Sequence, residues 1–258
     1  MSKLRARCPD CRTYTAVALG PNYECHTCGR EFYAGLVRVP RAWGEGGETM
    51  AQAAFLNLPY PEAAVVEEDT LAEQTFAVAA DLPDRPLVLG GCCCAHVGAV
   101  EALSARHGRL GLVWFDAHGD LNTSETSPSG NLWGMPLRMV LDSGAVAPED
   151  TALVGARALD PPERDFIAAT GLGTGVEAVA PALEGTEGVY VAFDADSTDP
   201  TQLDVFMPEP GGLMLDEVEV ILGDVASRAP VLGLGYSGLA SGERNVEPLG
   251  RLAAALGL

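Results

Sequence analysis

The chain has 258 residues, 47% of them hydrophobic and 20% charged, which is an ordinary globular balance with enough length to bury a large core. The apolar fraction excludes a disordered chain, the 30 glycines follow no three-residue period, and no run of about eighteen apolar residues could span a membrane. The formal net charge is −20, with nine basic against 33 acidic side chains after residue 41, so most of the chain would repel nucleic acid and anionic lipid.

Four cysteines near the N-terminus form two CxxC pairs in the pattern C-x2-C-x13-C-x2-C. This spacing supplies four thiolates for a tetrahedral zinc ion. The alternative is a redox pair or a chance pattern, but so short a segment has too few apolar residues to fold without a metal. We therefore predict that residues 1–38 form a structural zinc ribbon, joined through the Pro/Gly-containing segment 39–47 to a domain covering 39–258. The expected zinc ligands are Cys8, Cys11, Cys25 and Cys28.

From about residue 50, segments typical of strands alternate with segments typical of helices. Strands separated by helices predict a parallel sheet with helices on both faces, which is a three-layer α/β fold. The predicted strands are 63–66, 87–89, 111–115, 152–154, 189–193 and 231–234. The predicted helices include 70–80, 95–106, 162–169, 215–226 and 246–256.

Three adjacent cysteines, Cys92, Cys93 and Cys94, lie between the predicted strand 87–89 and the predicted helix 95–106. The carboxyl end of a strand is where α/β proteins place their ligands, and a helix N-terminus favours a thiolate. The alternative is that small buried residues simply pack the turn, which suits Cys92 and Cys94 best.

Acidic residues follow two of the predicted strands at corresponding places. Strand 111–115 is followed by DAHGD, and strand 189–193 is followed by DADSTD. Alternate side chains at a strand end point the same way, so the acidic groups of each motif can converge. N-cap and turn aspartates are the alternative. Two matching clusters, one containing an imidazole, favour hard divalent cations instead. The candidate ligands are Asp116, His118, Asp120, Asp194 and Asp196.

The motif DAHGD, the loop LNTSETSPSGN and the motif FDADSTDP resemble the arginase–agmatinase (ureohydrolase) family. The resemblance runs from about residue 85 to the C-terminus and includes MPEPGGL at 207–213. It implies an arginase-like fold and two manganese ions that share bridging carboxylates and activate one hydroxide. By motif position, it implies that the bridging ligands are Asp116 and Asp194. His118 and Asp196 would complete one metal site. Asp120, with Cys93, would complete the other and would hold the hydroxide as the catalytic residue.

The same resemblance implies how a substrate with an amino-acid end would be held. By position, Asn122, Ser127, Ser129 and Asn131 match the residues that bind the α-carboxylate, and Asp160 matches one that binds the α-amino group. Plain loop polarity is the alternative explanation for these residues.

Three features depart from the family pattern. The sequence GGCCC places Cys93 where the family has a metal-binding histidine, and His96, one turn later, is a substitute candidate. Trp133 stands where the family often has an imidazole. The last strand reads GLGYSG, with Tyr236 and Ser237 near the place of the carboxylate that holds a guanidinium group. Loss of that carboxylate argues against an ordinary guanidinium substrate.

The sequence therefore predicts a hydrolase of non-peptide C–N bonds in linear amidines, acting on an amidino or formimino derivative of a small amino acid. The alternative is a catalytically impaired ligand-binding or regulatory protein whose zinc ribbon docks a partner. We expect a small-molecule substrate, no membrane partner and no nucleic-acid partner, and the sequence leaves homo-oligomerisation open. Basic residues at the N-terminus are not followed by an apolar segment, so we expect a cytoplasmic protein.

Overall fold

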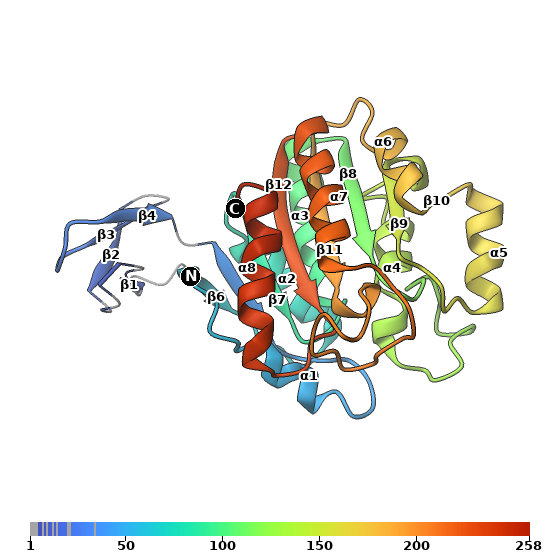
Figure 1. Cartoon of the computed structure of the whole chain (residues 1–258), viewed down its shortest axis with the longest axis horizontal. Helices are drawn as coiled ribbons and strands as arrows, with labels where there is room; N and C mark the ends of the chain where they lie inside the picture. The colour runs from blue at the N-terminus through green and yellow to red at the C-terminus, as the bar shows by residue number, and fades with distance from the viewer. Residues whose placement is uncertain are drawn as a thin grey trace.

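A parallel eight-stranded sheet forms the centre of the main domain (Figure 1). The computed structural model describes residues 5–6, 8, 10–11, 13, 15–19, 22–33 and 35–258. The strand order is β10-β9-β8-β11-β12-β7-β5-β6, and each neighbouring pair is parallel. The strands are β5 (Leu36–Val39), β6 (Glu62–Val65), β7 (Leu87–Gly90), β8 (Leu110–Phe115), β9 (Thr151–Val154), β10 (Gly173–Thr174), β11 (Gly188–Asp194) and β12 (Val231–Ser237).

Helices cover both faces of this sheet, which confirms the predicted three-layer α/β fold. Successive strand residues point to opposite faces, so Phe115 packs in one apolar core and Trp114 in the other. The first core is covered by α1 (Glu48–Ala53), α6 (Val179–Ala182), α7 (Leu215–Arg228) and α8 (Val246–Ala255). The second is covered by α2 (Leu71–Asp81), α3 (Ala95–His107), α4 (Pro136–Asp142) and α5 (Pro161–Thr170). Short 3-10 turns lie at Leu132–Gly134, Pro148–Asp150, Val176–Ala178, Ala195–Ser197 and Glu243–Asn245.

The N-terminal segment folds as a separate four-stranded antiparallel sheet, seen beside the main domain in Figure 1. Its strands are β1 (Arg5–Ala6), β2 (Ala16–Leu19), β3 (Asn22–Cys25) and β4 (Glu31–Tyr33). Ala63 of the edge strand β6 packs against the small core around Cys8 and Tyr23. The small sheet therefore contacts the large one at its β6 edge.

The predicted boundary at residue 38 falls inside β5, which pairs with β6 and β7 in the large sheet. This strand was not predicted from the sequence because Arg38 interrupts its apolar run. The Arg38 guanidinium is buried and donates to the carbonyls of Ala54 and Leu56 and to the carboxylate of Glu62. These partners satisfy the charge inside the fold. The large sheet thus begins at Leu36, inside the segment predicted to belong to the ribbon.

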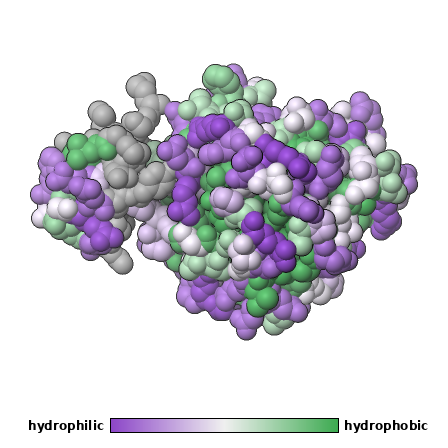
Figure 2. Space-filling view, turned by 90° about the horizontal axis from the view of Figure 1, so that it is seen from above, coloured by the Kyte–Doolittle hydropathy of each residue, from purple (hydrophilic) through white to green (hydrophobic). Residues whose placement is uncertain are grey.

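The surface is mixed in character. Hydrophilic residues are interspersed with small groups of hydrophobic ones on the face that Figure 2 shows. Among the described residues, no helix is both long and apolar enough to cross a membrane.

Candidate metal centre and pocket

The predicted metal ligands meet at the carboxyl edge of the large sheet. Cys93 follows β7, Asp116 follows β8, and Asp194 is the last residue of β11. Parallel strands end at the same edge, so three motifs far apart in the sequence converge there. Every residue expected to bind a catalytic metal lines or forms the floor of one pocket.

The first donor group contains Asp116, His118 and Asp196, whose potential ligand atoms all lie within 4.8 Å of one another. His118 Nδ1 is 2.9 Å from Asp196 Oδ2 and 3.4 Å from Asp116 Oδ1. The His118 backbone N–H also donates to Asp116 Oδ1 at 2.8 Å. One nitrogen and two carboxylates therefore face a common point.

The second donor group contains Cys93, Asp116 and Asp120, again within 4.8 Å. Asp116 belongs to both groups, as a bridging ligand would. The Cys93 thiol donates to Asp194 Oδ2 at 3.0 Å, and the Ser237 hydroxyl donates to the same oxygen at 3.0 Å. Asp194 is thereby held against the second donor group.

The acidic groups fit a pair of divalent ions. Burial and the neighbouring Asp196 raise the pKa of Asp194 to about 7, and burial together with Asp116 raises the pKa of Asp196 to about 6. Burial works against protonation of His118, yet Asp116 and Asp196 raise its pKa to about 12. Asp120 has a positive φ of 54°, and its buried Oδ2 has no hydrogen-bond partner among the residues that the structure describes. Cations would satisfy this oxygen and offset the mutual repulsion.

His96 lies beneath the donor cluster rather than in it. Its ring is fully buried, with Nδ1 3.1 Å from the Tyr190 hydroxyl and Nε2 3.1 Å from the Ser237 hydroxyl. Burial lowers the pKa of His96 to about 3. The ring also fills the space that a side chain at Gly235 would need. Of the two candidates for the missing histidine, the geometry therefore brings Cys93 to the cluster and leaves His96 as a support for Ser237.

Tyr236 does not face the pocket, contrary to the expectation from the GLGYSG motif. Its hydroxyl donates to the Leu249 carbonyl at 2.6 Å, and its ring packs on Phe193 in the core under α7 and α8. Ser237 points under Cys93, at 3.1 Å from its sulfur. The residue of this segment that lines the pocket is Gly238.

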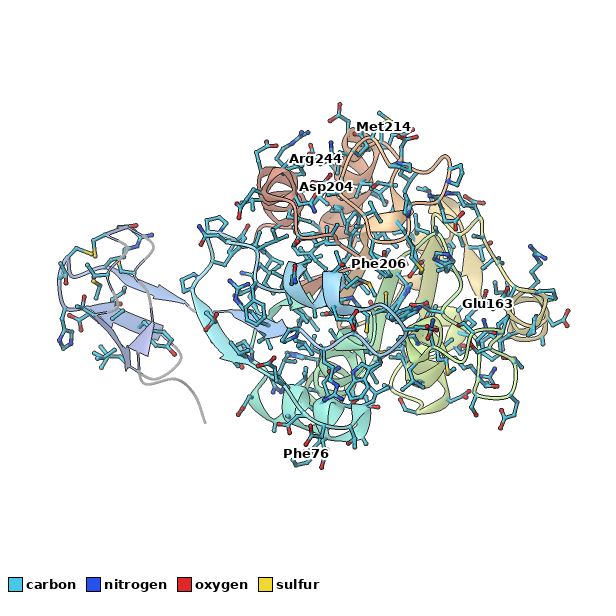
Figure 3. The ribbon with its side chains drawn as sticks, turned by 90° about the horizontal axis from the view of Figure 1, so that it is seen from below. Phe76, Glu163, Asp204, Phe206, Met214 and Arg244 are labelled. Carbon is cyan, nitrogen blue, oxygen red and sulfur yellow. The ribbon has the colours of Figure 1, made fainter. Side chains whose placement is uncertain are left out.

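The pocket above the cluster has a volume of about 250 Å³. Trp133 and Phe206 form an aromatic wall, with ring centroids 6.0 Å apart. Phe206 and Glu163, both labelled in Figure 3, reach the pocket from the segment after β11 and from α5. Within the described part of the chain, no lysine or arginine lines this cavity. The remaining polar lining residues above the cluster are Asn122, Ser127, Ser129, Asn131 and Asp160.

The five residues expected to hold an amino-acid end all line the pocket. They differ in whether their amide and hydroxyl groups already have hydrogen-bond partners. Asn122 donates to Asp160 at 2.9 Å and accepts from the Thr126 hydroxyl, so its amide already has partners. Ser127 and Ser129 accept backbone N–H groups, which leaves each hydroxyl proton available as a donor.

Two parts of the pocket were missed from the sequence. Glu163 accepts the backbone N–H of Leu121 at 3.0 Å and that of Asp160 at 2.8 Å, and so ties α5 to the loop that follows Asp120. The DPPE spacing of a capping box was the available signal. The segment 39–47, predicted as a connection, and the start of α1 form a wall, because the Trp133 ring packs on Gly44 and Met50 lines the cavity.

The four N-terminal cysteines also come together. Their sulfur atoms lie within 4.8 Å of one another, and all four are free thiols. The Cys8–Cys28 and Cys11–Cys25 sulfur separations are both 3.5 Å. Four sulfurs in one cluster fit a tetrahedral zinc site.

Comparison with known proteins gives consistent matches. A family model described as "Arginase family" matches residues 49–236. The arginase of Bacillus caldovelox is 38% identical over an alignment of 159 residues, and the match covers 51% of this chain and 53% of that protein. The arginase of Staphylococcus aureus strain COL is 39% identical over an alignment of 142 residues, and the match covers 45% of this chain and 47% of that protein. The chain thus spans about half the length of the curated relatives it matches.

Solved structures extend the likeness over the whole large domain. A crystal structure of arginase from Bacillus subtilis covers 87% of this chain and 98% of its own, with a TM-score of 0.71 and 24% identity. The formimidoylglutamase of Bacillus subtilis subsp. subtilis strain 168 covers 87% of each chain, with a TM-score of 0.69 and 17% identity. At these identities, the structural likeness concerns the fold.

Proposed function

Because the chain belongs to the arginase family, we propose that it is a metal-dependent hydrolase of non-peptide C–N bonds in small linear amidines. The observation that carries this proposal is the cluster of buried carboxylates, imidazole and thiol at the floor of a 250 Å³ pocket. Binuclear clusters of this kind are chiefly catalytic devices.

The residues present divide into two metal sites that share carboxylates. His118 and Asp196 would hold one divalent ion, Cys93 and Asp120 would hold the other, and Asp116 and Asp194 would contribute carboxylates to both. Two such ions would acidify a shared water and direct it at a planar carbon. Asp120 supports this role because its Oδ2 is buried and lacks a partner, so it can hold the attacking group as the catalytic residue.

The donor set distinguishes the two sites. The His118 site offers only oxygen and nitrogen ligands, which suit manganese. The other site includes the sulfur of Cys93, a softer donor that suits manganese less. We propose manganese in the first site and a more weakly held or different divalent ion in the second. We propose that the ribbon is a separate N-terminal domain and that its four cysteines bind a structural zinc ion.

The pocket favours an amidino or formimino head on an amino-acid tail. The residue that follows the last strand and lines the pocket is Gly238, which has no carboxylate. A strongly basic guanidinium group would therefore lack the counter-charge that this segment supplies in the family pattern. At the tail, Ser127, Ser129 and Asn131 can donate to a carboxylate, and Asp160 can accept from an amine. Solved relatives by fold include a formimidoylglutamase and a proclavaminate amidino hydrolase, which fit this substrate class. Arginine and agmatine should therefore be poor substrates.

The test is metal analysis of the purified chain, followed by ammonia and urea release from a panel of amidines with added manganese. We expect divalent metal beyond the ribbon zinc and turnover of a weakly basic amino-acid derivative. Asp116→Asn should abolish both. Asp199→Asn is the matched control, because Asp199 accepts from Thr201 and lies outside both donor groups.

A second candidate is supported by the same two departures, Cys93 and Gly238. A ligand-binding or regulatory relative would bind panel members without hydrolysing them. Binding without turnover at full metal occupancy would reject the hydrolase and favour this alternative. Fast arginine hydrolysis would instead contradict the proposed substrate class.

A further inference from the structure

The ring of His118 has a second acidic neighbour on the side away from the donor cluster. Nδ1 faces Asp116 and Asp196, whereas Nε2 lies 3.6 Å from Glu209 Oε1. The Glu209 side chain is 35% exposed and does not line the pocket. It comes from the loop between β11 and α7, within the segment MPEPGGL.

This loop is fixed to the metal-binding turn by one arginine. The Arg157 guanidinium donates to the carbonyls of Glu209, Pro210 and Gly211 in the loop. It also donates to the carbonyl of Asp196, at 2.7 Å, in the turn that carries a metal ligand. Arg157 therefore fixes the backbone of Glu209 and the turn that carries Asp196 to one another.

A second set of contacts fixes the far end of the loop. The Leu213 N–H donates to the Ser197 carbonyl at 3.1 Å, and the Asp199 N–H donates to the Leu213 carbonyl at 3.0 Å. Gly212 has a φ of 112° and passes so close to Thr198 that a Cβ there would collide with it. Both ends of the loop thus set the position of Glu209 over the imidazole.

We propose that Glu209 is a positioning residue for the His118 metal site, holding the imidazole through its outer nitrogen. This inference rests on the proposed function, since it assumes an ion on Nδ1. An ion on that nitrogen requires the ring proton on Nε2. The N–H then points towards the Glu209 carboxylate, whose Oε1 must come closer than the present 3.6 Å to accept it in a hydrogen bond. Such outer carboxylates fix the tautomer and make the imidazole a stronger ligand.

The primary measurement is Mn²⁺ affinity, by electron paramagnetic resonance of free Mn²⁺, on the full chain with zinc in its ribbon. Glu209→Ala should weaken the tighter site about 10-fold or more. Glu209→Gln keeps an acceptor for the N–H and should lose less. Glu243→Gln, which removes an exposed carboxylate elsewhere, is the control and should change nothing. Thermal unfolding of each metal-free variant shows whether the fold is kept.

A spectroscopic readout separates positioning from a general structural effect. Of the chain's four histidines, His118 belongs to the donor cluster. In protein titrated with Co²⁺, its Nε2 proton should give one strongly shifted, exchangeable NMR signal. Glu209→Gln should retain the signal, and Glu209→Ala should lose it to exchange with water.

The outcomes are distinct. Unchanged Mn²⁺ affinity in Glu209→Ala, with ions bound in both proteins, would overturn the inference and leave the proposed function standing. An increase in KM for cationic substrates at unchanged metal affinity would make Glu209 a substrate counter-charge instead, which also overturns it. A wild-type chain with no divalent ion outside the ribbon would reject the proposed function together with the inference.

Discussion

Replacing Cys93 by histidine should strengthen Mn²⁺ binding at the weaker site, and the structure sets a lower limit to the gain. Burial and the carboxylates of Asp120, Asp194 and Asp116 raise the pKa of Cys93 well above the ordinary 9.0. The thiol must lose this proton before its sulfur can coordinate an ion. Even at a pKa of 9.0, deprotonation at about pH 7 costs about 2.7 kcal/mol, or about 100-fold in affinity. A neutral imidazole avoids this cost and is the better ligand for manganese.

Calorimetry in two buffers of different ionisation enthalpy measures both the affinity and the protons released. In the wild-type chain, the weaker site should release a proton on binding Mn²⁺ and should gain about 10-fold in affinity per pH unit. Cys93→His should bind at least about 100-fold more tightly at about pH 7 and release fewer protons. Cys94→Ala, at the neighbouring buried thiol, is the control. Identical affinity, stoichiometry and proton release in wild type and Cys93→His would refute coordination at residue 93.

Three other changes test the ribbon and the buried network. A Cys25→Ser, Cys28→Ser variant should lose one zinc by metal analysis and the ribbon's amide protection by hydrogen exchange, while the large domain stays folded. Tyr236→Phe removes the hydrogen bond to the Leu249 carbonyl of α8 and should lower the free energy of unfolding by about 0.5–1.5 kcal/mol with KM unchanged. His96, neutral when folded, takes up a proton only on unfolding, so its contribution to the free energy of unfolding should fall by about 1.4 kcal/mol per pH unit below 6.5, measured by denaturant titration as the difference between wild type and His96→Gln. His96→Gln should lack this loss, and the exposed His107→Gln should retain it.

The alternation of strands and helices was predictable because each strand of a sheet covered on both faces is an uninterrupted apolar run. Strands such as 110–115 and 188–194 carry that signal in their own residues. β5 does not, because its Arg38 is satisfied by carbonyls and a carboxylate that belong to later segments. Helix α4 was not predicted either, since it is only seven residues long.

The clustering of the candidate metal ligands was predictable for a similar local reason. The alternation in DAHGD and DAD places carboxylates on one side of a strand end wherever the strand lies. The substrate end of the site was harder. Strand 231–234 was expected to stop three residues before its actual end at Ser237. Successive residues of a strand face opposite sides, so an error of one position turns a core residue, Tyr236, into an apparent pocket residue.

Glu209 illustrates what the sequence could not reveal. It is 91 positions from the histidine it faces, and neither side chain carries a local pattern that pairs them. They lie close together because Arg157 donates hydrogen bonds to carbonyls of two separate turns. Contacts of this kind are set by tertiary structure alone.

Installing the missing carboxylate at Gly238 should not create an arginine hydrolase. Gly238 lines the pocket, has a φ of 67°, and sits so close to Asp194 that a Cβ would fall on that carboxylate. A non-glycine residue in this left-handed conformation costs about 1–2 kcal/mol. Asp194 cannot move freely, because Cys93, Ser237 and the Asp196 N–H all bind its oxygens.

Gly238→Glu should therefore displace a bridging metal ligand and lower the metal content before it can bind a guanidinium group. Gly134→Glu is the matched control, since Gly134 also lines the pocket but has open space around its Cβ position. That variant should keep its metal while adding the same charge to the same cavity. Metal analysis and urea release from arginine, measured on both variants, decide the matter. Full metal content with new arginine turnover in Gly238→Glu would contradict this prediction. It would show that the Asp194 side chain can move aside despite its three hydrogen bonds.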